Sequence, residues 1–98
     1  MEILKNLDNT MLKLSLQGRL DTTTAPQMEA AMKDGLDAVK DLTLDFEQLE
    51  YISSAGLRVL LSLQKRMNAQ GKMVVCHVCP AIQEVFEVTG FTDILTIQ

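Results

Sequence analysis

The residues with the clearest potential for chemistry are Ser54 and the segment Cys76-His77-Val78-Cys79. A catalytic serine needs a histidine and an acid in one pocket. His77 is the only histidine in the chain, and no Gly-x-Ser-x-Gly motif surrounds Ser54. We therefore interpret His77 as a structural or exposed residue, and we expect that the protein is not an enzyme.

The cysteines and the histidine also raise the hypothesis of a metal site. A closed zinc site takes four ligands, whereas this segment supplies three. On a strand, Cys76 and Val78 would face one way while His77 and Cys79 face the other, so the ligands would converge poorly. A redox Cys-x-x-Cys pair belongs at a helix start, where only Cys79, directly before Pro80, is expected. We therefore expect small buried cysteines, no metal site and no cofactor.

The composition of the chain narrows the possible functions. Its 98 residues, 47% of them hydrophobic, suit a single domain over 1–98. The net charge is −4 and the basic residues are scattered, which argues against direct nucleic-acid binding. No apolar stretch approaches the roughly 20 residues that span a bilayer, and no signal peptide is recognisable. We expect a cytoplasmic protein without membrane insertion.

The hydrophobic pattern predicts strands. Residues 11–20 alternate with period two, which is typical of a half-buried strand, and a short strand over 3–7 precedes it. Apolar residues in phase predict another strand over 41–46, and a nearly continuous apolar run over 72–78 predicts a buried one. Residues 94–97 offer a last short strand.

A first helix is expected after the strand at 11–20. Thr24, with Gln27 three residues later, fits a capping box. Apolar residues follow at helical spacing from Met28 to Val39. Gly35 weakens this helix and is not expected to end it.

Two more helices are expected between and after the later strands. Ser53 and Ser54 form the N-cap of one that ends near Gly71. Pro80 opens the other, which stops at Gly90. The alternation of strands and helices predicts an α/β fold, with an antiparallel pair followed by parallel strands in a mixed sheet of four to five strands and helices packed against it.

A serine at a helix start also suits phosphorylation. The first turn of a helix presents unpaired N–H groups and positive partial charge, so it can hold a phosphate without unfolding. The modification adds about −1.5 to −2 charges to the surface. The alternative is that Ser53 and Ser54 are simple caps contributing about 1 kcal/mol. The residue types alone favour this alternative, because Ser-Ser before a helix is common.

Short motifs along nearly the whole chain resemble the STAS domain, specifically the small bacterial anti-sigma factor antagonists. Each motif is weakly specific, but their order and spacing in a chain of this length are fairly specific. The motifs are Gly18-Arg19-Leu20-Asp21, Asp45-Phe46 with Leu49, Ile52-Ser53-Ser54-Ala55-Gly56-Leu57, Gly71-Lys72-Met73-Val74-Val75 and Pro80. The resemblance implies a STAS-like fold for the single domain.

It also implies a partner-switching phosphoprotein in transcription regulation. An unphosphorylated antagonist of this family binds an anti-sigma factor that is a serine kinase, which releases the sigma factor. The kinase then phosphorylates the antagonist and the complex dissociates, until a PP2C-type phosphatase removes the phosphate. Alignment on the Gly-Leu pair places the acceptor on Ser54. The implied partner-binding positions are Asp21, Ser53, Ser54, Ala55, Gly56 and Leu57.

Three alternatives stay open. Family members usually carry aspartate before the acceptor, where this chain has Ser53, so Ser53 is an alternative acceptor and the kinase interaction is open. The protein could instead be a non-phosphorylated STAS scaffold or a subunit of a membrane lipid or anion transport system. Leu57 and Val59 would suit a partner helix if exposed and the core if buried.

Overall fold

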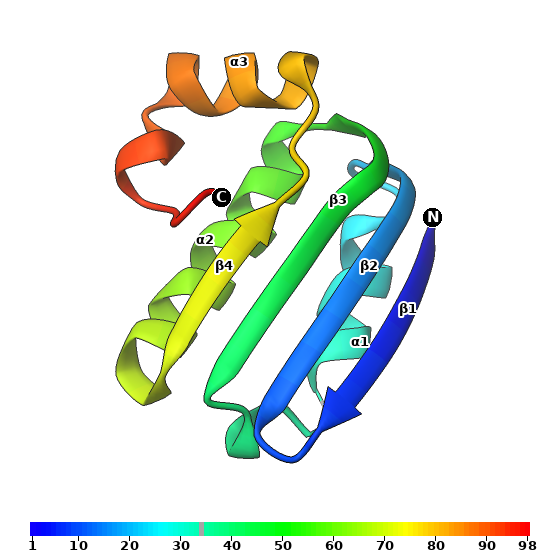
Figure 1. Cartoon of the computed structure of the whole chain (residues 1–98). Coiled ribbons are helices and arrows are strands. Elements are labelled where there is room, and N and C mark those ends of the chain that lie inside the picture. Colours follow the sequence, from blue (N-terminus) through cyan, green and yellow to red (C-terminus); the bar gives the residue numbers. More distant parts are fainter. Residues whose placement is uncertain (34) are drawn as a thin grey trace.

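A four-stranded sheet lies at the centre of the structure, a computed structural model that describes residues 1–33 and 35–98 (Figure 1). The strands are β1 (Glu2–Asp8), β2 (Met11–Leu20), β3 (Asp41–Ile52) and β4 (Lys72–Cys76), in that order across the sheet. As predicted, β1 and β2 are antiparallel, whereas β2, β3 and β4 run parallel. The mixed sheet therefore has four strands, the lower of the two numbers expected.

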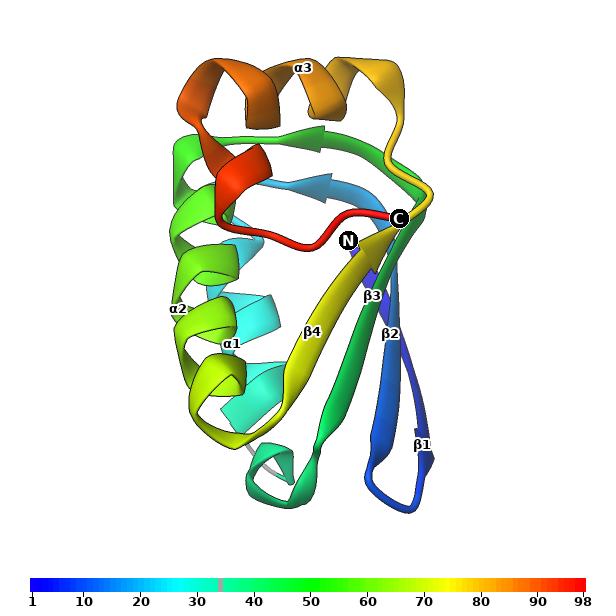
Figure 2. The same ribbon diagram turned by 60° about the vertical axis from the view of Figure 1, so that its left-hand side comes forward.

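Two helices connect the parallel strands and lie on the same face of the sheet. α1 (Ala25–Lys33) follows β2, and α2 (Ser54–Gln70) follows β3. Both crossovers step in the same direction across the sheet, so the right-handed rule for such crossovers places both helices on one side (Figure 2). In the ranges described, no helix is both long and apolar enough to cross a membrane.

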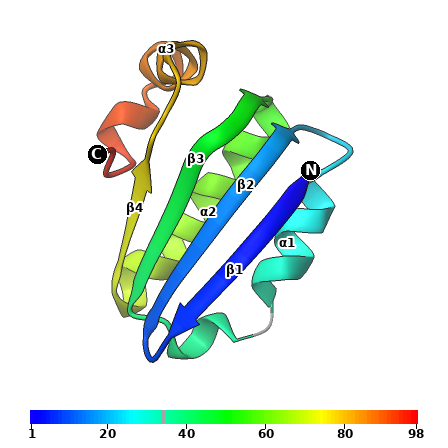
Figure 3. The same cartoon turned by 45° about the vertical axis from the view of Figure 1, so that its right-hand side comes forward.

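The opposite face of the sheet has no helix of the described residues over it (Figure 3). α3 (Pro80–Thr89) lies across one end of the layers, beyond the carboxyl ends of β3 and β4 (Figure 2). It is anchored by Phe86, whose ring centroid lies 6.4 Å from that of Phe46 on β3. Both rings are fully buried, and each such side chain contributes about 1.5–3 kcal/mol of transfer free energy.

The expectations for the first helix are partly wrong. No capping box forms, because the Gln27 side chain donates to the Met1 carbonyl at 2.8 Å and Thr24 Oγ1 accepts from the Asp21 N–H. Gly35 has φ of +80°, so the regular helix does not continue through it. α1 ends at Lys33, and a short 3₁₀ helix, η1 (Leu36–Ala38), follows.

The strand expected over 41–46 continues to Ile52 as β3. The pairing with β2 skips a position, since Ser15 and Gln17 pair with Asp45 and Gln48. This β-bulge shifts the phase of the apolar residues along β3, which is why the alternation seen in the sequence stops at 46 while the pairing continues.

The last two predicted strands are shorter than expected. β4 ends at Cys76 because His77 takes the left-handed conformation, with φ of +57°. The segment at 94–97 makes only a single bridge, between Val75 and Ile97. The helix boundaries at Pro80 and Gly90 are confirmed.

The end of α2 provides a test of the packing at Gly71. A Cβ atom there would lie 2.0 Å from the Lys40 carbonyl oxygen, which belongs to the backbone entering β3. We expect Gly71→Ala to lower the free energy of unfolding by about 2–3 kcal/mol, because the neighbouring backbone must move. Urea denaturation monitored by circular dichroism measures this loss.

Gly35→Ala is the matched control, since a Cβ at Gly35 meets no atom of the described residues within 4 Å and costs only the strain of its positive φ, about 1 kcal/mol. Equal losses in the two variants would contradict the close approach at Gly71.

Candidate functional site

Ser54 lies where the parallel strands β2 and β3 end. Leu20 pairs with Ile52, and the Ser53 N–H donates to the Leu20 carbonyl at 2.9 Å. Beyond this last contact, β2 continues into Asp21 and β3 into Ser54. The carboxyl ends of neighbouring parallel strands thus bring these two predicted site residues to one edge of the domain, the usual position for a functional site in such sheets.

The two serines have different structural positions. Ser53 is half-buried and is the N-cap of α2, with extended φ and ψ of −102° and 178°, and its Oγ accepts from the Gly56 N–H at 3.5 Å. Ser54 is the first residue of α2 and is exposed. Ser53 therefore supplies the capping oxygen of α2, while Ser54 is open to solvent beside the positive end of the helix.

Gly56 allows α2 to pack directly on the strand ends. A Cβ at this position would lie 2.8 Å from both Leu20 Cγ and Ile52 Cγ1. The next residue, Leu57, is only 7% exposed, and Val59 is 4% exposed. Both side chains thus belong to the core, which removes the alternative of an exposed apolar patch. Gly56 and Leu57 are therefore buried residues that position the start of α2 by packing.

Asp21 is held as a carboxylate at the start of the loop after β2. The Thr23 hydroxyl donates to Oδ1 at 2.8 Å, and the Thr23 and Thr24 N–H groups donate to the same oxygen. The hydrogen bond from the Thr23 hydroxyl, with these amides, lowers the pKa of Asp21 below its usual value. Arg19 Nε lies 3.6 Å from Asp21 Oδ2, and the Arg19 guanidinium covers the Tyr51 ring at 4.2 Å.

Arg19 and Tyr51 were not predicted as site residues. The register of β2 against β3 makes them direct partners. Tyr51 is exposed, so an aromatic and a cationic group adjoin the edge that carries Asp21 and Ser54. Only the pairing register brings them together, and no local pattern in the sequence indicates it.

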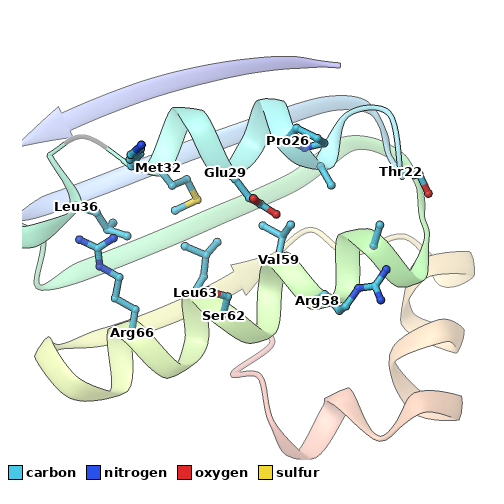
Figure 4. A pocket seen from close by; sticks show the side chains of 13 residues that line it. Thr22, Pro26, Glu29, Met32, Leu36, Arg58, Val59, Ser62, Leu63 and Arg66 are labelled. Carbon is cyan, nitrogen blue, oxygen red and sulfur yellow. The ribbon is translucent and has the colours of Figure 1, made fainter.

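A groove of about 600 Å³ runs between α1 and α2 (Figure 4). Met32, Val59 and Leu63 line its apolar floor, and Arg58 lies near the end at which α2 begins. The wall includes Ala55, the residue after Ser54. The groove is therefore continuous with the edge that carries Ser54, although Ser54 itself is not part of its lining. It depends on how two helices pack, which explains why the sequence did not predict it.

His77 takes a position that differs from the expected one. Its Nδ1 lies 2.9 Å from Asp45 Oδ1, so its partner is a carboxylate on β3. The prediction that Cys76 and His77 point to opposite sides of a strand is wrong. The strand β4 ends at Cys76, and the backbone of His77 turns after it. Potential ligand atoms of Asp45, Cys76 and His77 lie within 4.8 Å of one another. Cys79 is the N-cap of α3, and both cysteines are half-buried rather than buried.

Comparison with known sequences gives a consistent match. The family model described as the STAS domain matches residues 2–98. BtrV of Bordetella bronchiseptica, provisionally named an anti-sigma factor antagonist, is 40% identical over 89 residues, which cover 89% of this chain and 77% of BtrV. The anti-sigma-B factor antagonist of Staphylococcus aureus is 26% identical over 87% of this chain and 81% of its own length.

Comparison with solved structures shows the same fold. An anti-sigma factor antagonist from Mycobacterium paratuberculosis superposes with a TM-score of 0.87 at 23% identity, covering 98% of this chain and 83% of the other. The phosphorylated form of SpoIIAA, a cell fate determinant of Bacillus, gives 0.77 at 20% identity, covering 99% and 91%. The expected α/β architecture, a mixed sheet with helices against it, is thereby confirmed.

The capping geometry predicts different effects of the two serines on stability. Ser53→Ala removes the acceptor for the Gly56 N–H, so we expect the free energy of unfolding to fall by about 1 kcal/mol. Ser53→Asp keeps an acceptor and adds a favourable charge at the helix start, so we expect little or no loss. Urea denaturation compares these variants with Ser54→Ala, the neighbouring control, for which we expect a change within about 0.5 kcal/mol. A loss in Ser54→Ala as large as that in Ser53→Ala would contradict this assignment of the cap.

Proposed function

This chain belongs to the STAS domain family, and we propose that it is an anti-sigma factor antagonist switched by phosphorylation of Ser54. The observation that carries the proposal is the contrast between the two serines. Ser54 is exposed at the first position of α2, whereas the Ser53 hydroxyl is half-buried and engaged with the Gly56 N–H. A kinase can therefore reach Ser54 without dismantling the cap. This geometry favours Ser54 over Ser53 as the acceptor.

In the proposed cycle the unphosphorylated protein binds an anti-sigma factor that is a serine kinase, and a sigma factor is released. The kinase then transfers the γ-phosphoryl group of ATP to Ser54 Oγ. The new O–P bond forms as the bond to the β-phosphate oxygen breaks, ADP leaves, and the hydroxyl proton passes to a base of the kinase. A PP2C-type phosphatase then hydrolyses the phosphoserine, which restores Ser54 and releases inorganic phosphate. We place this cycle in the cytoplasm.

The charge of the phosphate explains how binding would be switched off. Phosphorylation adds about −1.5 to −2 charges at a site where the complex buries a neutral hydroxyl. The Asp21 carboxylate lies at the same edge, so the phosphate adds to a negative charge already present there. Within the free protein, the N–H groups of the first turn of α2 can hold the phosphate, and the fold stays intact. The switch is then a change of surface charge on an unchanged domain.

The binding surface we propose for the kinase includes the edge around Ser54 and the adjoining end of the groove between α1 and α2. Asp21, Ser54 and Ala55 are its accessible predicted members, and Arg58 adds a positive charge one turn further along α2. Ser53, Gly56 and Leu57 support this surface by capping and packing α2. The groove that opens beside this edge extends the proposed surface between the two helices.

Phosphorylation of Ser54 is directly measurable. We expect the wild-type protein, incubated with ATP and a serine kinase of the anti-sigma factor class from its own organism, to gain a single phosphate. Intact-mass spectrometry gives the number of phosphates, and peptide mapping gives the position. Ser54→Ala should gain none, and Ser53→Ala should gain one as the wild type does.

A phosphate on Ser53 would keep the mechanism and contradict the choice of residue. An unmodified protein, with a kinase proven active on another antagonist, would contradict the switch and favour a non-phosphorylated scaffold or transport subunit. Binding to the kinase provides the second readout, in which Ser54→Asp should bind at least about tenfold more weakly than Ser54→Ala.

The groove can be tested through two exposed residues of α2. Arg58 lines the groove near Ser54, whereas Lys65 is exposed and is not among the lining residues. We expect Arg58→Ala to weaken kinase binding by about fivefold or more, because a charged contact at the surface is lost, and Lys65→Ala to change it by less than about twofold. Isothermal titration calorimetry with the kinase measures both. Equal effects would exclude the groove from the interface.

A further inference from the structure

Asp45 and Cys76 face the side of the sheet opposite α1 and α2. They are direct partners in the register of β3 and β4. Their neighbours Leu44 and Val75 are also partners and are fully buried towards α1 and α2, so the alternation along each strand points Asp45 and Cys76 the other way. Asp45 is nevertheless only 8% exposed. A carboxylate and a thiol thus lie side by side in a sheltered position on this face.

His77 completes the group because of its backbone conformation. With φ of +57°, the chain turns after Cys76 and the imidazole returns towards β3. His77 Nδ1 reaches 2.9 Å from Asp45 Oδ1, while the same oxygen accepts from the Glu47 N–H at 3.0 Å. Carboxylate, thiol and imidazole donors from two strands and a turn therefore converge within 4.8 Å.

We propose that Asp45, Cys76 and His77 form a binding site for one Zn²⁺ ion. Thiolate, imidazole and carboxylate are the three ligand types that zinc takes in proteins, and three protein ligands leave a fourth position for water. Around a tetrahedral zinc the ligand atoms would lie about 3.3–3.8 Å apart, since the metal bonds are about 2.0–2.3 Å long. The ligand atoms, now within 4.8 Å of one another, would approach by up to about 1–1.5 Å on binding. The His77 side chain is 59% exposed, so solvent can reach the site.

The charges of the surrounding groups are compatible with a divalent cation. Asp45 and an ionised Cys76 supply two negative charges, which Zn²⁺ balances. The cation nearest to Asp45 is Lys13, whose Nζ lies 3.5 Å from Oδ2 and whose side chain is half exposed, so it can withdraw. Burial, with the neighbouring Asp45, raises the pKa of Cys76. Formation of the Zn–S bond releases the thiol proton to solvent.

The expected role of the ion is a clamp between β3 and the connection that leads into α3. It lies on the face of the sheet opposite α2, the helix that begins at Ser54. Zinc binding and phosphorylation can therefore be tested separately, and failure of one does not decide the other.

The experiment uses the full chain, stripped of metal with a chelator and kept reduced with a phosphine. Titration calorimetry with Zn²⁺ should give one site per chain with a dissociation constant of about 1–10 μM. Co²⁺ should produce the near-ultraviolet thiolate-to-metal band in the wild type. Cys76→Ser should lose this band, and His77→Asn should weaken zinc binding by about tenfold or more. Asparagine is chosen because it tolerates the left-handed backbone.

Cys79→Ser is the matched control, because its sulfur is outside the group, and it should bind zinc as the wild type does. Circular dichroism confirms that each variant is folded before titration. The proposal is overturned by an absence of zinc uptake in the wild type, by unchanged binding in Cys76→Ser or His77→Asn, or by loss of binding in Cys79→Ser, which would indicate a Cys76–Cys79 pair instead.

Discussion

The parallel pairing of β2 with β3 is the constraint on which the rest of the structure depends. It requires a crossover, which α1 supplies, and the next parallel step to β4 requires α2. The same pairing ends with Leu20 beside Ile52, where the Ser53 N–H bonds to the Leu20 carbonyl. The chain after β2 and the start of α2 must then share one edge. Gly56 lets the helix pack directly on Leu20 and Ile52 at the strand ends, and this close approach positions Ser54.

The different structural positions of Ser53 and Ser54 follow from this packing. Ser53 is half-buried because it closes the first turn of α2 over the strand ends, and Ser54 is exposed because it lies on the next position of the helix. One hydroxyl stabilises the helix, while the residue that follows it is exposed to solvent. A phosphate on Ser54 would face unpaired N–H groups, so the helix start favours the added charge while a partner surface opposes it. These opposing preferences would produce a switch without a change of fold.

The two faces of the sheet have different surroundings for a topological reason. Right-handed crossovers that step in one direction put α1 and α2 on one face, and their apolar residues bury that side. The other face keeps polar strand residues such as Lys13 and Asp45. Asp45 is sheltered there by its neighbours, and the hydrogen bonds from the Glu47 amide and His77 outweigh the burial that would raise its pKa, which is held below the usual value. This carboxylate is therefore ionised at neutral pH, as a metal ligand or an ion-pair partner must be.

Local patterns in the sequence determined most elements of this protein. The period-two alternation of 11–20 specified β2, and Ser53, Gly71, Pro80 and Gly90 specified the helix ends, because caps and breakers act through neighbouring backbone groups. The position of Ser54 at a helix start was predictable for the same reason. The resemblance of the chain's motifs to the STAS domain agreed with the match of the STAS family model to residues 2–98.

Tertiary structure decided what depends on contacts between distant segments. The bulge in β3 and its pairing up to Ile52 follow from the register with β2, which no local alternation encodes. The contact of Arg19 with Tyr51, the groove between α1 and α2, and the convergence of Asp45 with Cys76 and His77 arise in the same way. The predicted position of His77 was wrong because the apolar run suggested a continuous strand. The left-handed backbone of His77 instead turns its ring back towards Asp45. Side chains on separate strands and helices meet only after the layers pack, so their chemistry is a property of the fold.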